Sequence, residues 1–384
     1  MARFKWKSLL IMCVFSIGVF ISWKFVGTES VYISPDNGKK KLILQWTRLF
    51  HHNFWLHDDI FKHCPVSSCR VTTDKKQLNR SDVVVFHPRN MHEHPLPSQK
   101  WKFQRWLLFS LEPPYLNGIL PQKYNNLFNW TMTYREDSDF VYSYNEVKRL
   151  SEKDTFSYVN ITLKTKLAVA RSSNCFPTNK RLEYIQELQK SVHVDFFGKC
   201  AGSVCSEHEC NDAGMKKYKF YLAFENGNCR NYISEKFWNA LLTFEAVPVV
   251  MGGSSPRDYI LVAPPGSYIN TADFSSPKEL AAYLVKLDKD DQLYMEYHNW
   301  RKNYTVALRD VHTNGKWKSI LPPHPAWCDL CGALHNSSSP PQVYTDLEAW
   351  YSQDTCPYDH QNVFCTAWNH CCFRKKPSDI FTCF

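Results

Sequence analysis

The sequence lacks the short motifs that mark four common enzyme classes. Its 384 residues contain no Gly-x-Gly-x-x-Gly, no P-loop lysine motif, no Gly-x-Ser-x-Gly and no His-Glu-x-x-His. These motifs carry the minimum parts of dinucleotide-dependent dehydrogenases, P-loop kinases, serine hydrolases and zinc proteases. Those classes are therefore excluded as first interpretations of the chain.

Internal repeats and blocks of basic residues are also absent. The formal net charge is +9, but the Lys and Arg residues are spread along the chain. This distribution argues against a nucleic-acid partner and weakly favours an anionic ligand such as a phosphate donor. With 44% hydrophobic residues, the chain can bury one large core or two cores of ordinary size.

An uncharged apolar run lies near the N-terminus. Residues 8–23 contain no charged side chain and follow Arg3, Lys5 and Lys7. No small-x-small cleavage site clearly follows, so an uncleaved signal anchor is favoured over a cleaved signal peptide. Because positive residues precede the span, we expect a single-pass type II membrane protein with a lumenal C-terminal portion. The predicted segments are a cytosolic tail (1–7), a transmembrane helix (8–26) and a flexible stem (27–41).

Cysteines and glycosylation sequons agree with a lumenal location. Without Cys13 in the predicted span, fourteen of the fifteen cysteines remain, an even number typical of disulfides in an oxidising compartment. Cys328-x-x-Cys331 could also suggest zinc or a redox pair, but no second such pair accompanies it, so disulfides with unassigned partners are favoured. Sequons, which permit modification without requiring it, occur at Asn79, Asn129, Asn160, Asn303 and Asn336.

Hydrophobic patterning predicts two α/β domains. Buried strands are expected at residues 41–46, 82–86 and 106–111, and a second set of strands and helices begins at residue 166. The alternation predicts two doubly wound domains that face one another, with ligands at the carboxyl ends of the strands. The predicted boundaries are 42–165, 166–350 and a Cys-rich tail, 351–384.

One segment reads as strand, loop, amphipathic helix and strand. Residues 218–226 are too continuously apolar for a sheet with one wet face, which predicts a central strand. Ser234 can cap the following helix beside Glu235 and Lys236, a pattern that suits a nucleotide diphosphate, with the lysine on phosphate and the carboxylate on ribose. A capped helix with a surface Glu–Lys pair is the competing interpretation. The expected buried stripe is Ile233, Phe237, Leu241 and Phe244.

The same segment carries a family resemblance. Phe224-Glu-Asn226 with Tyr232-x-Ser-Glu-Lys236 resembles the signature of the α1,3/4-fucosyltransferases, inverting enzymes that use GDP-fucose. Several long motifs in a fixed order are more specific than one short pattern. The resemblance covers roughly residues 42–350 and implies two facing Rossmann-like domains of the GT-B type. Further similar segments, in the family's order, are residues 108–114, 128–139, 170–174 and 327–331.

The resemblance implies a role for each candidate residue. It makes Glu112 the base, places Arg181 and Lys236 on the donor pyrophosphate, and places Glu235 on the ribose. The full set of donor-binding candidates is Asn174, Arg181, Asn226, Tyr232, Glu235 and Lys236.

The position of Glu112 in the sequence gives a physical reason to expect a base there. Glu112 follows an apolar strand and precedes Pro113-Pro114, where the chain must leave the sheet. Desolvation beside apolar residues would raise its pKa towards a useful range for a base. From position alone, a strand-end surface glutamate is the competing interpretation.

Asp137-Ser-Asp139 invites comparison with the Asp-x-Asp metal clamp of other sugar-nucleotide enzymes. It resembles instead a segment of the family's acceptor lobe, and the donor phosphates already have cationic partners. We therefore predict no metal ligand and no required cofactor, with Mn²⁺ or Mg²⁺ acting only to assist GDP release. Acceptor-binding candidates are Trp130, Tyr134, Asp137 and Asp139.

These observations predict a Golgi membrane enzyme that transfers L-fucose from GDP-β-L-fucose to a GlcNAc hydroxyl of a glycan, forming an α1,3 linkage. Two alternatives stay open: the same fold with another nucleotide sugar, and a non-catalytic lumenal glycan-binding protein. The acceptor also stays open among N-acetyllactosamine, its GalNAc-containing relative and the N-glycan core.

Overall fold

The computed structural model describes most of the chain from residue 40 onward. No helix among the described residues is long and apolar enough to cross a membrane. The predicted cytosolic tail and transmembrane helix lie outside them, as does the predicted stem up to residue 39. The described residues are 40–49, 52, 56–118, 120–151, 158–203, 205–307, 312–313, 316–317, 324–336, 342–352, 356, 363–365, 371–373 and 382–383.

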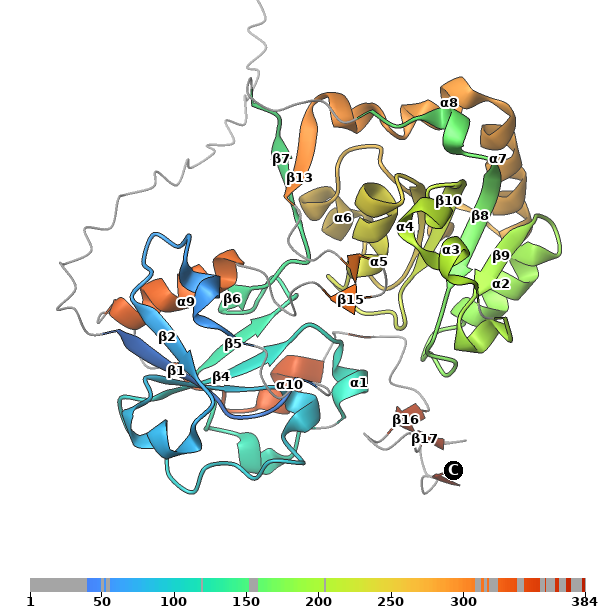
Figure 1. The fold of residues 1–384 in the computed structure, drawn as a ribbon. Coiled ribbons are helices and arrows are strands. Elements are labelled where there is room, and N and C mark those ends of the chain that lie inside the picture. Colours follow the sequence, from blue (N-terminus) through green and yellow to red (C-terminus); the bar gives the residue numbers. More distant parts are fainter. Residues whose placement is uncertain are drawn as a thin grey trace, which may run out of the picture. The chain divides into compact units, whose positions relative to one another are not determined.

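The first lobe is built on a six-stranded sheet in the order β2-β1-β3-β4-β5-β6, in which every neighbouring pair is parallel (Figure 1). All four residues of β3 are buried, as expected for an apolar strand covered on both faces. The strands are β1 Lys41–Gln45, β2 Cys69–Thr72, β3 Val83–Phe86, β4 Arg105–Ser110, β5 Trp130–Thr133 and β6 Phe140–Val141.

The second lobe is built on a five-stranded parallel sheet in the order β12-β11-β10-β8-β9. Its central strand β10 is buried at all seven positions, which confirms the prediction for this segment. Phe220 packs in a core with residues of α2 and α7, whereas Tyr221 packs in a core with residues of α5. The strands are β8 Lys166–Arg171, β9 Val194–Phe197, β10 Tyr218–Phe224, β11 Val247–Met251 and β12 Ile269–Asn270.

Helices cover both sheets, and smaller strands form separate pairs and a small sheet. The apolar patterning of residues 180–191 and 276–287 predicts two helices of the second set, and these correspond to α2 and α7. The helices are α1 Pro114–Asn117, α2 Arg181–Gln189, α3 Glu207–Cys210, α4 Asp212–Met215, α5 Glu235–Trp238, α6 Pro256–Val262, α7 Pro277–Lys289, α8 Asp291–Glu296, α9 Pro325–His335 and α10 Leu347–Ser352. The remaining strands are β7 Glu146–Arg149, β13 Tyr304–Ala307, β14 His312–Thr313, β15 Lys316–Trp317, β16 Val363–Cys365, β17 Cys371–Phe373 and β18 Thr382–Cys383.

Helix α5 begins where the sequence predicts. Ser234 is its N-cap, the first α-helical residue is Glu235, and Asn231 in the preceding loop has a left-handed backbone with φ 58°. After Trp238 the chain continues as a π-helical turn, Asn239–Thr243. The expected stripe is nevertheless buried along its whole length: Ile233, Phe237, Leu241 and Phe244.

The C-terminal part of the chain returns to the first lobe. Trp327 of α9 packs 5.4 Å from Phe109 of β4, and Tyr351 of α10 belongs to the apolar cluster that contains Phe86 of β3. Figure 1 shows both helices beside the first sheet. Apolar faces of α9 and α10, which the sequence analysis includes in the second domain (166–350), are thus buried against the first lobe. The predicted domain boundaries stay a prediction.

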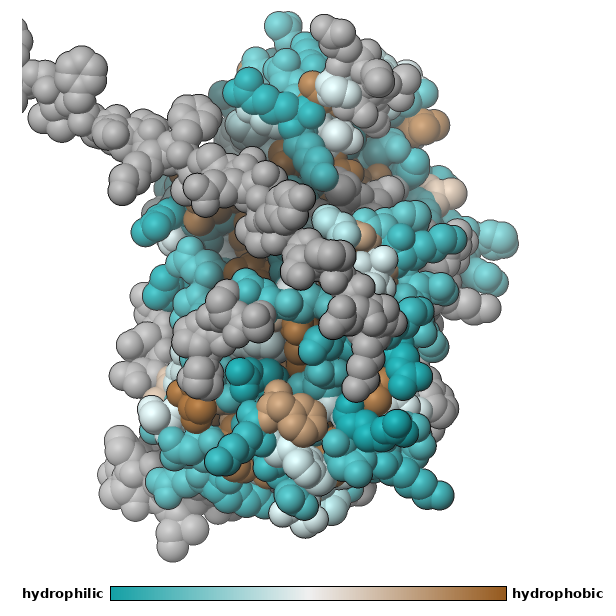
Figure 2. Space-filling view, turned by 90° about the vertical axis from the view of Figure 1, so that its left-hand side faces the viewer, coloured by the Kyte–Doolittle hydropathy of each residue, from teal (hydrophilic) through white to brown (hydrophobic). Residues whose placement is uncertain are grey.

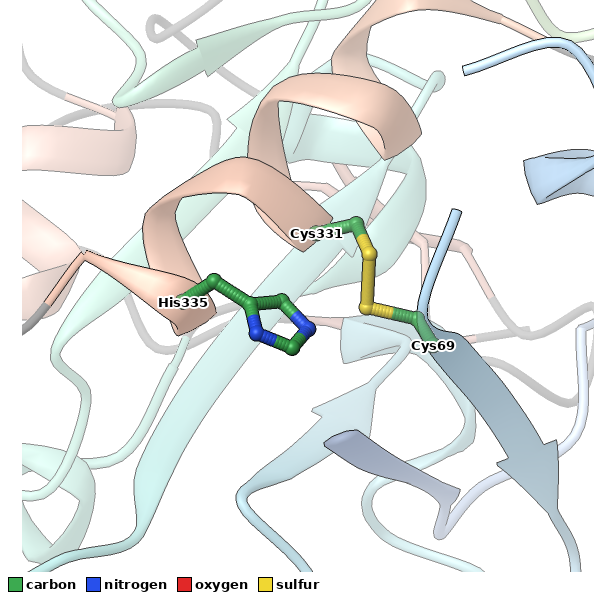
Figure 3. A group of neighbouring side chains, drawn as sticks. All are labelled: Cys69, Cys331 and His335. Carbon is green, nitrogen blue, oxygen red and sulfur yellow. A yellow bond between two sulfur atoms is a disulfide. The ribbon is translucent and has the colours of Figure 1, made fainter. Parts of the chain in front are cut away.

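Ten of the described cysteines form five disulfides, which confirms the prediction of disulfides from the cysteine count. Cys328 and Cys331, both on α9, pair with Cys64 and Cys69 of the first lobe. His335 lies next to the second of these bonds (Figure 3), and its Nε2 is 3.0 Å from the carbonyl oxygen of Ser68. Because the sulfur atoms of Cys69 and Cys331 are bonded to each other, this group is a disulfide beside a histidine and not a set of free metal ligands. The other pairs are Cys175–Cys200, Cys205–Cys210 and Cys229–Cys356.

The surface view agrees with a chain whose apolar residues are mostly internal. On the face in Figure 2, hydrophilic residues cover most of the coloured surface, and hydrophobic residues form small separate areas. The fold is thus stabilised by burial within the two lobes and at their contact.

Candidate active site

Glu112 lies immediately after β4, where the chain turns into α1. Its carbonyl oxygen accepts hydrogen bonds from Ser110 Oγ and from the Tyr351 hydroxyl, each at 3.0 Å. Asn117 Nδ2 donates to the same oxygen at 3.3 Å. Three donors thus fix the backbone of this turn, and the turn sets the direction of the Glu112 side chain.

The Glu112 carboxylate faces the second lobe. The hydroxyl of Tyr232 donates to Glu112 Oε2 at 3.1 Å. Burial and the nearby carboxylate of Glu235 raise the pKa of Glu112 to about 7, although Lys236 and the Tyr232 hydrogen bond oppose the shift. Such a carboxyl group is partly ionised near neutral pH and can accept a proton there.

Glu225, which sequence reasoning left without a role, organises the turn before α5. Its side chain is 1% exposed and accepts hydrogen bonds from Ser234 N at 2.8 Å and Ser234 Oγ at 2.7 Å. The quoted Phe224-Glu-Asn226 motif contained this residue, and its position directly after β10 was the available signal. Glu225 therefore determines how α5 begins.

Lys236 lies between two carboxylates. Its Nζ is 3.3 Å from Glu225 Oε2 and 3.0 Å from Glu235 Oε1, and it donates to Ser234 Oγ at 2.9 Å. Burial opposes its charge, but the neighbouring carboxylates raise its pKa above the ordinary value. Burial likewise opposes ionisation of Glu235, yet Lys236 lowers its pKa. Both members of this pair are therefore ionised near neutral pH.

Arg181, at the start of α2, is 3% exposed. Its guanidinium donates to Phe224 O at 3.1 Å, Ser172 Oγ at 2.8 Å and Asn174 O at 3.2 Å. It thereby joins the carboxyl ends of β8 and β10. Within the described part of the chain its Nε is buried and has no hydrogen-bond partner.

A cavity of about 350 Å³ opens at the carboxyl ends of β8 and β10. It brings together five of the six donor-binding candidates, while Tyr232 faces Glu112 instead. Asn226 Oδ1, like Arg181 Nε, is buried without a partner among the described residues, which leaves both atoms available to a ligand in this cavity. The lining residues are Arg171, Ser172, Ser173, Asn174, Arg181, Gly198, Cys205, Cys210, Tyr221, Asn226, Glu235, Lys236 and Asn239.

Arg171 and Tyr221 also line this cavity and were not singled out from the sequence. Arg171 is the last residue of β8, and its guanidinium forms no hydrogen bond or ion pair with other described residues. Since Lys236 is already paired with two carboxylates, Arg171 supplies charge that is not compensated locally. A diphosphate would meet this charge together with that of Arg181.

Two acceptor-binding candidates, Trp130 and Asp139, take part in the packing of the first lobe, and their acceptor-binding role stays a prediction. Trp130 is buried and packs 5.4 Å from Phe140. Asp139 Oδ2 accepts hydrogen bonds from Thr131 N at 2.8 Å and the Tyr344 hydroxyl at 2.8 Å. Neither residue lines the cavity, because both are engaged in holding β5 and its neighbours.

The other two acceptor candidates lie closer to the lobe contact. Asp137 forms a bidentate pair with Arg135, with distances of 2.8 and 2.6 Å. Tyr134 packs with its ring centroid 5.0 Å from that of Tyr232, and it lines a second, mainly apolar cavity of about 120 Å³. Their acceptor-binding role stays a prediction.

The sequons differ in exposure. Asn129 is 4% exposed, and its Nδ2, the atom to which a glycan would attach, donates to Gln342 O at 2.8 Å. Modification in the folded state would break this contact, and glycosylation of Asn129 stays a prediction. The remaining four sequon asparagines are exposed: Asn79, Asn160, Asn303 and Asn336.

Family models match both lobes of the chain. The model described as "Fucosyltransferase, N-terminal" matches residues 38–145, and "Glycosyltransferase family 10 (fucosyltransferase) C-term" matches residues 161–350. The two matches follow one another in the order expected from the sequence motifs.

Characterised proteins of three animals are similar over most of the chain. Glycoprotein 3-alpha-L-fucosyltransferase A of Drosophila melanogaster is 36% identical over 82% of this chain and 61% of its own length. Alpha-(1,3)-fucosyltransferase fut-6 of Caenorhabditis elegans is 30% identical over 84% of this chain and 83% of its own. The human 3-galactosyl-N-acetylglucosaminide 4-alpha-L-fucosyltransferase FUT3 is 37% identical over 74% of this chain and 76% of its own. This chain therefore spans less than two thirds of the Drosophila protein.

Among solved structures, a crystal structure of an alpha1,3-fucosyltransferase with GDP aligns with a TM-score of 0.47 and 17% sequence identity. The alignment covers 79% of this chain and 93% of that one.

Proposed function

Because this chain belongs to the fucosyltransferases of glycosyltransferase family 10, we propose that it transfers L-fucose from GDP-β-L-fucose to a GlcNAc hydroxyl of a glycan and forms an α1,3 linkage with inversion. The observation that carries this proposal is the placement of Glu112, with its raised pKa, against the lobe whose cavity holds Arg181 and Lys236. A base on one side and cations on the other are what a single displacement requires.

The donor diphosphate binds in the cavity at the ends of β8 and β10. Arg171, Arg181 and Lys236 offset its negative charge, and Asn226 Oδ1 accepts a hydrogen bond from the donor. The Glu235 carboxylate accepts the ribose hydroxyls. The orphaned polar atoms of Arg181 and Asn226 support this assignment, since ligand contacts would satisfy them.

Transfer proceeds in one step. As the acceptor oxygen attacks the anomeric carbon, Glu112 takes the hydroxyl proton, and the carbon–oxygen bond to GDP breaks with its electron pair on the phosphate. The cationic side chains stabilise the charge that develops on departing GDP. Because these cations do the work that a metal does elsewhere, the reaction requires no metal, and Mn²⁺ or Mg²⁺ acts only on GDP release.

We place the enzyme in the Golgi membrane with a lumenal catalytic portion. The five disulfides support an oxidising compartment, and the predicted signal anchor precedes the described residues. Protease protection of the full-length chain in sealed microsomes tests this topology, and digestion of the folded lobes from outside would contradict it.

Substitution Glu112→Gln tests the base assignment. The amide keeps the side-chain volume but cannot take the proton, so turnover should fall by at least about 100-fold while GDP affinity stays within about twofold. Turnover is measured with purified full-length enzyme and GDP-fucose, and GDP affinity by calorimetry.

Glu183→Gln, on the exposed side of α2, is the matched control and should leave both quantities unchanged. Near-normal turnover of Glu112→Gln would show that another group accepts the proton. A panel of nucleotide sugars and a glycan array with linkage analysis identify donor and acceptor in the same preparation. No transfer from any donor would refute the enzymatic proposal.

A further inference from the structure

The Tyr232 hydroxyl contacts the opposite lobe. The family resemblance implies a donor contact for this residue, yet its hydroxyl donates to Glu112 Oε2 at 3.1 Å and it does not line the donor cavity. Tyr232 is 1% exposed, and its ring packs against Tyr134 at 5.0 Å and Tyr144 at 6.3 Å between centroids. The hydroxyl is therefore held in one position by aromatic residues of the first lobe.

The loop before Tyr232 contacts two residues of the first lobe and is cross-linked to Cys356. Cys229 is disulfide-bonded to Cys356, and Arg230 forms an ion pair of 3.6 Å with Glu136. Gly227 lies against Tyr115 so closely that a Cβ at this position would be 2.3 Å from the ring atom Cε1. Contacts on both sides of Cys229 thus hold this loop beside the turn that carries Glu112.

We propose that Tyr232 is a positioning residue that holds the Glu112 carboxylate across the lobe contact. The proposal rests on Glu112 being the base of the proposed transfer reaction. Engagement of Oε2 by the tyrosine directs the remaining oxygen, Oε1, towards the acceptor hydroxyl. Closure of the two lobes and readiness of the base are thereby coupled, since the hydrogen bond exists only when both lobes are in contact.

The surroundings of Glu112 define the expected pH effect. Charged groups face it from α5 and from the end of β10, and tyrosines face it from the first lobe and α10. The Tyr232 hydrogen bond stabilises the ionised carboxylate, so its loss raises the pKa of Glu112. The groups are Glu225, Tyr232, Glu235, Lys236, Tyr134, Tyr144 and Tyr351.

Substitution Tyr232→Phe removes the hydroxyl and keeps the ring. We expect the acidic limb of the kcat profile of the full-length enzyme to move up by roughly one pH unit. Near pH 7 this shift alone lowers kcat roughly fivefold, because a smaller fraction of Glu112 is ionised. KM for GDP-fucose should change less than about twofold if the tyrosine acts through Glu112.

Tyr259→Phe is the matched control, because Tyr259 is a buried tyrosine of the same lobe that packs 5.7 Å from Phe237 of α5. The Tyr259→Phe variant should leave the acidic limb of the kcat profile and KM for GDP-fucose unchanged. An unmoved limb in Tyr232→Phe, with or without a raised KM, would overturn the proposal. That outcome is distinct from failure of the proposed function, in which Glu112→Gln keeps its turnover.

Discussion

At the residue scale, the pairing of Lys236 with Glu225 and Glu235 changes which cations are available to a ligand. A lysine between two carboxylates, at 3.3 and 3.0 Å, has its charge already balanced. Affinity for a diphosphate must then depend strongly on the two arginines of the cavity. The terminal nitrogens of Arg181 already donate three hydrogen bonds to protein oxygens, so Arg171 has the freest donors among the described cations of this site.

Substitution Arg171→Ala should raise KM for GDP-fucose roughly tenfold, the loss of about 1.4 kcal/mol of binding, with kcat changed little. The effect should shrink at high salt, since part of it is electrostatic. Steady-state kinetics at two ionic strengths measure both expectations. Arg257→Ala, on the exposed face of α6, is the control. Equal KM values for the Arg171 variant and wild type would exclude Arg171 from the donor site.

Residue-level prediction from the sequence succeeded where a residue's position along one segment was sufficient. Glu112 follows a strand and precedes two prolines, which predicted both its place and the direction of its pKa shift. Arg171 and Glu225 were not assigned, because their roles depend on which strands are neighbours in space. The hydrogen bonds of Asp139 with Thr131 and Tyr344 could not be predicted either, because these partners lie on other segments.

At the element scale, the start of α5 is held by side chains rather than by helix length. Ser234 caps the helix, and its Oγ also donates to the buried Glu225 carboxylate at 2.7 Å. After only four α-helical residues the chain adopts a π-helical turn. Such turns are frequent at functional sites, and the spacing of apolar residues does not distinguish them from an α-helix. This explains why the sequence predicted the Ser234 cap and the buried stripe but not the change to a π-helical turn.

Substitution Ser234→Ala should destabilise the fold and weaken GDP binding together. Glu225 loses one of its two hydrogen-bond donors from Ser234, which costs about 1–2 kcal/mol for a buried charged group. We expect thermal unfolding to begin at least roughly 2 °C lower and GDP affinity to fall several-fold, because Lys236 loses its fixed position.

Ser276→Ala provides the comparison, since Ser276 caps α7 through the Glu279 amide at 3.3 Å. It should lower the unfolding temperature but leave GDP affinity unchanged. Scanning calorimetry and GDP titration distinguish the two variants. Normal GDP affinity in Ser234→Ala would mean that the cap has no part in donor binding.

At the scale of the whole molecule, covalent links connect segments that are far apart in sequence. Cys64–Cys328 and Cys69–Cys331 have sequence separations of 264 and 262, and Cys229–Cys356 has 127. The cysteine count and the lumenal setting predicted disulfides, but pairing requires knowledge of which surfaces meet. For the same reason, the packing of α9 on the first lobe could not be predicted from the sequence.

Replacement of both Cys229 and Cys356 by serine should lower kcat/KM on the order of tenfold at a temperature where the protein stays folded. The loop before Tyr232 then loses its covalent link to Cys356, so Tyr232 holds the Glu112 carboxylate less firmly. A misplaced base transfers protons less efficiently. Replacement of Cys69 and Cys331 by serine is the control. It should cost about 2–5 kcal/mol of stability without a comparable loss of kcat/KM at that temperature. Equal losses in both variants would mean that the Cys229–Cys356 bond acts on stability alone.

The hydrogen bond from the Tyr351 hydroxyl to the Glu112 carbonyl oxygen has a consequence for the order of biosynthesis. Glu112 is synthesised early, but the tyrosine that supports its turn lies 239 residues later in the sequence. Folding of the first lobe during translation therefore cannot complete this turn. We expect a chain that ends before α10 to lack one of the three hydrogen bonds to the Glu112 carbonyl oxygen.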